Sequence, residues 1–221
     1  MKERPIIFSA PMVRAILDGR KTQTRQVVKP QPPHSCRYVM NGAASHALCF
    51  GPNDECVPPT GTSIDHRLPC PYGVPGDRLW VRETWNTLPL RHVFYREGGE
   101  MHKDWKWRSP IHMPRWASRI TLEITAVRVE RLNEISAKDA VREGVGLPDE
   151  CDHEIECSDP RNGATWTDLE SNAAGGCPWS SCHCARDCFR ELWDRINGKR
   201  HPWSSNPWVW VLEFKRLETE T

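Results

Sequence analysis

The sequence predicts an α+β fold, with a small core of about five strands and three helices between three long loops. Apolar and polar residues alternate over 119–129, which is the pattern of a half-buried strand. An apolar stripe at helical spacing runs through 184–197. Nine of the 19 prolines lie in 29–75, so this stretch is predicted to be an irregular insertion.

The N-terminal elements follow from short local patterns. Residues 5–8 (PIIF) are predicted to form a strand. Ser9 is a favourable N-cap, because its hydroxyl can accept an N–H of the first helical turn. Apolar residues then follow at helical spacing until Gly19 ends the helix, namely Met12, Val13, Ile16 and Leu17. Threonine and valine favour a second strand over 21–28.

Two more strands are predicted towards the middle and the end of the chain. A Pro-Gly-Asp turn at 75–77 leads into a strand over 78–85 (RLWVRETW), and the last strand is expected over 207–217. Trp208 and Trp210 are expected to share one face of that last strand and, like Trp203, to belong to the core.

Two later helices complete the prediction. Ser136 can cap a short helix over 137–143, with Asp139 at the capping-box position and Gly144 as the stop. The helix over 184–197 is the clearest in the chain. Its apolar stripe consists of Phe189, Leu192, Trp193 and Ile196.

The length of 221 residues fits a single domain that covers 1–221. The irregular stretches are expected to be insertions at about 29–75, 86–118 and 145–183. Loops of this length in a compact domain are usually functional or disordered.

Charge is distributed unevenly, although the formal net charge is only +1. Residues 1–40 carry eight basic and two acidic side chains, whereas 130–170 carry twelve acidic and four basic ones. The total excludes a uniformly basic nucleic-acid binder. The basic segments are either solvated surfaces or neighbours of an anionic ligand.

No apolar run approaches 18 residues, and the N-terminus has no long apolar stretch. We therefore expect no membrane span, no secretory signal and a cytoplasmic location. The ten cysteines are then expected to be reduced thiols or metal ligands. No P-loop, GxGxxG, HExxH or GxSxG motif occurs, so no organic cofactor is expected.

Five blocks of the sequence, taken together, resemble the ASCH family, a branch of the PUA-like β-barrels. These blocks are AILDGRKTQTR (15–25), GDRLWVRE (76–83), ITLEIT (120–125), DAVREG (139–144) and NPWVWVLEF (206–214). The resemblance is nearest to phage and prophage members and does not cover the three insertions. It implies a small β-barrel with flanking helices, a cleft near GRKTQT, and binding of RNA or modified nucleosides.

One bacterial branch of this family is an amidohydrolase that removes the acetyl group from N(4)-acetylcytidine. The resemblance to that branch implies that Lys21, Thr24 and Glu143 are catalytic. The residue chemistry agrees, because a desolvated lysine can act as the base that activates a threonine hydroxyl. On an extended segment Lys21 and Thr24 would project to opposite faces. They converge only if the chain turns just after Gly19. The alternative is a polar rim that binds phosphate.

Further candidates concern binding. Guanidinium groups match phosphate oxygens, so Arg20, Arg25 and Arg82 are candidate phosphate contacts. Glu83 is a rival carboxylate for the site or, alternatively, the ion-pair partner of a nearby arginine. Trp105 and Trp107 alternate with basic residues, a mixture that holds single-stranded nucleic acid. They are alternatively packing residues of a long loop.

Four cysteines are spaced closely enough to hold a structural zinc ion, although not in a standard zinc spacing. They are Cys177, Cys182, Cys184 and Cys188. A second set has a weaker basis and consists of Cys36, Cys49, Cys56 and Cys70. Free thiols are the alternative for both sets.

The sequence therefore favours an RNA- or nucleoside-binding hydrolase, either an amidohydrolase on acylated cytidine or a ribonuclease. A binding module without chemistry, for RNA or modified-base nucleic acid, is the main alternative. A phage protein that interacts with a host component is a lesser one.

Overall fold

The computed structural model describes residues 1–31, 37–40, 46–50, 67–88, 92–97, 106–145 and 183–217, with the backbone alone for 37–40, 46–50, 67 and 183–184. A central sheet has the strand order β1-β6-β9-β10-β2. Its strands are β1 (Glu3–Ile7), β2 (Gln23–Val27), β6 (Arg78–Arg82), β9 (Thr121–Arg131) and β10 (Trp208–Leu217). The helices are α1 (Ala10–Leu17), α2 (Ala137–Arg142) and α3 (His183–Asn197). The α+β prediction is confirmed, and each predicted strand and helix has its counterpart.

Two insertions contain regular structure that the sequence did not predict. The first holds a three-stranded sheet of β3 (Arg37–Met40), β4 (His46–Phe50) and β5 (Arg67–Pro69). The second holds a hairpin of β7 (Trp85–Thr87) and β8 (Val93–Tyr95), followed by short 3₁₀ turns at Pro110–His112 and Arg115–Ala117. Two further 3₁₀ turns lie at Leu132–Glu134 and Trp203–Ser205. Most of the third predicted insertion lies outside the described residues.

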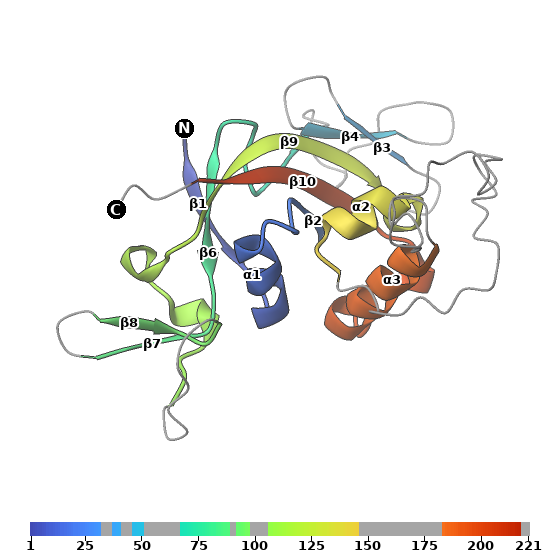
Figure 1. Ribbon diagram of the computed structural model, residues 1–221. Helices are drawn as coiled ribbons and strands as arrows, with labels where there is room; N and C mark the ends of the chain where they lie inside the picture. Colours follow the sequence, from blue (N-terminus) through green and yellow to red (C-terminus); the bar gives the residue numbers. More distant parts are fainter. Residues whose placement is uncertain are drawn as a thin grey trace, which may run out of the picture.

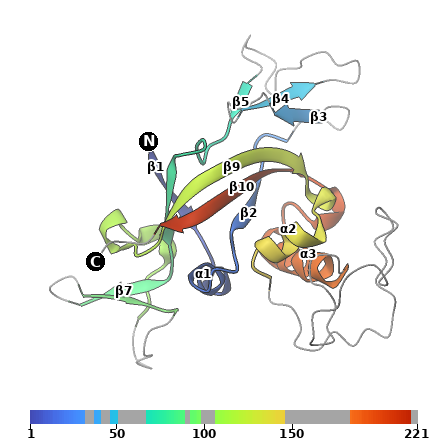
Figure 2. The ribbon, with the colours of Figure 1, turned by 45° about the horizontal axis from the view of Figure 1, so that its top comes forward.

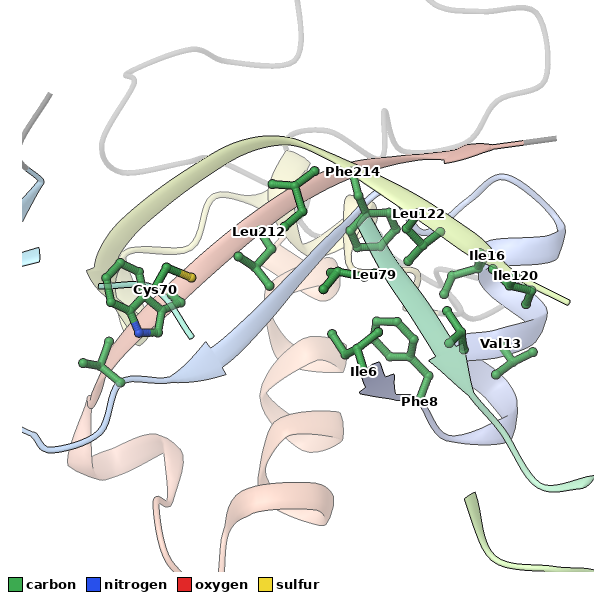
Figure 3. Packing of buried hydrophobic residues seen from close by; sticks show 14 of the residues in the cluster. Ile6, Phe8, Val13, Ile16, Cys70, Leu79, Ile120, Leu122, Leu212 and Phe214 are labelled. Carbon is green, nitrogen blue, oxygen red and sulfur yellow. The ribbon is translucent and has the colours of Figure 1, made fainter. Parts of the chain in front are cut away.

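The central sheet is strongly curved, but it is not a closed barrel (Figures 1 and 2). Strand β1 pairs in parallel with β6, and the other pairs of the central sheet are antiparallel. Because the sheet does not close, β1 and β2 are its two edges. The predicted β-barrel is therefore wrong as regards closure. Helix α1 lies inside the curve, where Val13 and Ile16 pack in the same core as Leu79 and Leu212 (Figure 3).

Strand β10 separates two cores, because its side chains alternate between the faces of the sheet. Trp208 and Trp210 point into the core beneath α1 and are buried, as the sequence predicted. Val209 and Val211 point the other way and pack with Phe189 of α3. The sheet is thus covered by α1 on one face and by α2 and α3 on the other, over the half that β2 and β10 form.

The helix caps are confirmed in part. Ser136 accepts the backbone N–H of Asp139 at 3.1 Å, as expected for its helix. Ser9 occupies the N-cap of α1, but its side chain makes no capping hydrogen bond, so that expectation is wrong. The Asp139 carboxylate contacts Arg128 at 3.1 Å. Within the described part of the chain, no helix combines the length and apolar character that a membrane span needs.

Asp77 connects the predicted turn to the N-terminal strand. Its carboxylate accepts the backbone N–H of Lys2 at 2.7 Å and the guanidinium of Arg4 at 2.9 Å. These hydrogen bonds hold the pKa of Asp77 below its ordinary value. The carboxylate therefore stabilises the fold above its unfolded-state pKa, and this contribution is lost as the pH falls through the lower folded-state pKa.

We expect Asp77→Asn to lower the free energy of unfolding at pH 7 by about 1–2 kcal/mol, since a neutral acceptor replaces a charged one. Urea denaturation of both proteins at pH 7 and pH 3 checks this. The difference between them should shrink at pH 3. An equal difference at both values would show that the charge of Asp77 does not matter.

Candidate functional site

Lys21 and Thr22 connect α1 to β2, just after the turn at Gly19, whose φ is 74°. The backbone N–H of Lys21 donates to Ala15 O at 2.9 Å, and that of Thr22 donates to Arg142 O at 2.9 Å. The connection is therefore bound to α1 on one side and to the end of α2 on the other. Because Lys21 precedes the strand, the alternation expected along an extended segment does not apply to it.

The Lys21 side chain reaches the residue that follows α2. Its Nζ donates to the backbone oxygen of Glu143 at 2.8 Å and to Glu143 Oε2 at 2.9 Å. The two side chains are 0% and 2% exposed, so this is a fully buried ion pair. Burial lowers the pKa of Lys21, and the neighbouring Glu143 carboxylate opposes this without cancelling it.

Arg25 approaches Glu143 from β2. Its Nη1 donates to Glu143 Oε1 at 3.0 Å, while Nη2 donates to Glu130 Oε1. The Arg25 side chain is 0% exposed, and its guanidinium lies 5.9 Å from the ring centre of Phe189 in α3. One carboxylate thus receives two buried cations. Arg25, which the sequence predicted as a phosphate contact, instead donates to carboxylates of its own chain.

The ion pairs continue from Arg25 across the face of the sheet that α2 covers. Arg128 of β9 donates to Asp139 at 3.1 Å and also contacts Glu130 and Glu213. Burial alone would lower the pKa of Arg128, but these three carboxylates together raise it. Sequence reasoning missed this network. Its members are spread from β2 to β10, and only the register of the sheet brings them together.

A cavity of about 360 Å³ lies at the free edge of β2, between α1 and α3. Thr24, Arg25 and Glu143 line it, together with the buried residues Phe8, Phe189 and Trp193. This volume is sufficient for a small ligand. Of the three residues predicted to be catalytic, Lys21 contacts Glu143, and Thr24 and Glu143 line the same cavity, whereas Lys21 is not among the residues that line it. The stripe of α3 suggested Phe189 and Trp193 only as core residues.

Three other candidates lie away from this cavity. Glu83 is buried and forms a two-pronged ion pair with Arg119, both distances being 2.9 Å, which confirms the alternative that it pairs with an arginine. Burial raises the pKa of Glu83, although Arg119 opposes this. Arg20 is exposed and pairs with Asp18 at 2.9 Å. Arg82 lies 4.6 Å from the ring centre of Trp80.

The remaining candidates fall partly outside the described residues. Trp105 is not among them, whereas Trp107 is half-buried. Cys177 and Cys182 also lie outside, and only the backbone of Cys184 is described. Cys188 is a half-buried thiol that packs against the core beneath α3. Within the described ranges no group of three or more metal-ligating side chains occurs, and the zinc site stays a prediction.

Comparison with protein-family models, curated proteins and solved structures found no match to this chain. The resemblance to the ASCH family therefore stays a prediction.

Proposed function

We propose that this protein binds a modified nucleoside or RNA in the cavity beside β2 and hydrolyses an acyl amide on cytidine there. The observation that supports this most is the buried contact of Lys21 with Glu143 at 2.9 Å, beside a cavity that both Thr24 and Glu143 line. Glu143 is thus in contact with the proposed base and lines the same cavity as the proposed nucleophile.

In the proposed reaction, the Lys21 ammonium first gives a proton to the Glu143 carboxylate that it contacts, which leaves a neutral amine beside a carboxylic acid. Thr24 Oγ1 then attacks the carbonyl carbon of the amide while its proton moves to the amine of Lys21. Burial of Lys21 lowers its pKa, which favours that neutral form. The tetrahedral intermediate collapses with cleavage of the C–N bond, and the leaving amine takes the proton back from Lys21. Water then hydrolyses the acyl ester on Thr24 and releases the carboxylic acid. Glu143 positions Lys21 throughout.

The test is incubation of the protein with N(4)-acetylcytidine and, separately, with end-labelled RNA. We expect release of acetate from the first, and we expect Thr24→Val to lower kcat/KM by at least about 100-fold. Valine has nearly the same shape as threonine, so the thermal unfolding midpoint should change little. Thr24→Ser is the matched control, since it keeps a hydroxyl and should retain most of the activity.

A binding module without chemistry is the second candidate, and one observation favours it. The Lys21 ammonium is 0% exposed and already donates to two oxygens of Glu143, as in a purely structural ion pair. If neither substrate is altered while binding is retained, this candidate replaces the hydrolase. Cleavage of the labelled RNA alone would instead indicate a ribonuclease.

A further inference from the structure

A second cavity, of about 590 Å³, adjoins the first. Both are lined by the same four residues, Gln26 and Val27 of β2 and Ile196 and Asn197 of α3. The two cavities therefore lie side by side along the free edge of β2, and together they are called the groove below. Tyr72 closes part of the second cavity, and its hydroxyl donates to Gln26 Oε1 at 3.2 Å.

The second cavity differs from the first in charge. Lys29, Lys199, Arg200 and His201 line it, and the residues that form it include no aspartate or glutamate. Unlike Arg25, the three permanent cations of this set have no carboxylate within 4.0 Å among the described residues. The C-terminal end of α3 carries about half a negative charge from the helix dipole, which would repel an anion here. Three full positive charges outweigh it.

The first cavity offers features that suit a nucleobase. The free edge of β2 can hydrogen-bond to a base there, and Leu192 and Ile196 of α3 add apolar surface. Val28 N donates to Trp208 O, and Thr22 O accepts Phe214 N, so the even-numbered residues of β2 bond to β10. By alternation, the backbone N–H and C=O groups of Arg25 and Val27 point away from β10.

We propose that the groove binds a nucleoside phosphate, with the base in the first cavity and the phosphate among Lys29, Lys199 and Arg200. This inference depends on the proposed function, because it assumes that the first cavity takes a nucleoside. It specifies the ligand further: a nucleoside phosphate, either a mononucleotide or a nucleotide of a single strand, binds more tightly than the free nucleoside.

Calorimetric titration tests this with N(4)-acetylcytidine, its 5′-monophosphate and a four-nucleotide single-stranded RNA that contains the same base. The Thr24→Val background prevents turnover during the measurement. We expect the monophosphate to bind about tenfold more tightly than the nucleoside, through charge-assisted hydrogen bonds. Added salt should weaken only the binding of the phosphorylated probes. Tighter binding of the RNA than of the monophosphate would identify a single strand as the ligand. Equal binding of the two would identify a mononucleotide.

The double variant Lys199→Glu/Arg200→Glu should remove this advantage and leave nucleoside binding unchanged. Lys2→Glu/Lys138→Glu, which reverses two exposed lysines that do not line the groove, is the matched control and should bind like the parent. If the nucleoside binds and its monophosphate binds no better, the phosphate site is refuted while the proposed function survives. If no probe binds, both are refuted.

Discussion

Glu143→Ala is expected to lower the free energy of unfolding by about 3–5 kcal/mol, because it leaves two buried cations without their shared partner. Lys21 loses its only carboxylate contact among the described residues. Arg25 loses one contact but keeps Glu130 and Asp139. The cost should therefore come mainly from Lys21, and urea denaturation followed by circular dichroism measures it.

Glu3→Ala is the control for this prediction, because Glu3 pairs with Arg115 where the two side chains are 37% and 42% exposed. Such a surface pair contributes less than about 1 kcal/mol. Equal losses for both variants would contradict a special role for burial. A double-mutant cycle with Lys21→Met measures the interaction free energy between Lys21 and Glu143, since the two side chains are in direct contact.

The Glu143→Ala variant should also respond to pH in a definite direction. Burial already lowers the pKa of Lys21, and loss of the Glu143 carboxylate removes the main opposing effect. Between this lowered pKa and the ordinary lysine value, the unfolded chain binds more protons than the folded one. Stability of the variant should therefore rise with pH across that interval.

The elements of the core could be predicted because each depends on a local pattern. The alternation over 119–129 and the stripe of α3 both reflect which face of an element is buried, and both have counterparts in β9 and α3. The small sheet of β3, β4 and β5 could not be predicted in the same way. Its strands have three to five residues each, and many prolines lie around them.

The site could be predicted in its residue types but not in its arrangement. Lys21 and Glu143 are 122 positions apart, and their contact depends on how the connection before β2 packs on the end of α2. Arg25 has the charge of a phosphate contact, yet its burial and pairing depend on strand register with β9 and β10. Charge alone cannot distinguish an arginine that binds a ligand from one that pairs within its own chain.

Gly144→Ala should be the most informative change at the junction of Lys21 with α2. Gly144 has a φ of 77°, where a side chain costs about 1–2 kcal/mol. A Cβ atom there would also lie 2.8 Å from both Ala15 Cβ and Lys21 Cβ, which is far inside a normal carbon contact. Relief of this overlap adds about 1–3 kcal/mol. We therefore expect a total loss of about 2–5 kcal/mol.

Gly19→Ala separates these two causes. Gly19 has nearly the same φ, 74°, but a Cβ atom there would meet nothing within 4 Å. It should therefore lose only the backbone contribution of about 1–2 kcal/mol. The excess loss in Gly144→Ala measures how tightly Lys21 is packed against the end of α2. Because relief of the overlap moves Lys21 relative to Glu143, only Gly144→Ala should also weaken nucleoside binding or turnover. Equal effects of the two variants would mean that this close packing does not position Lys21.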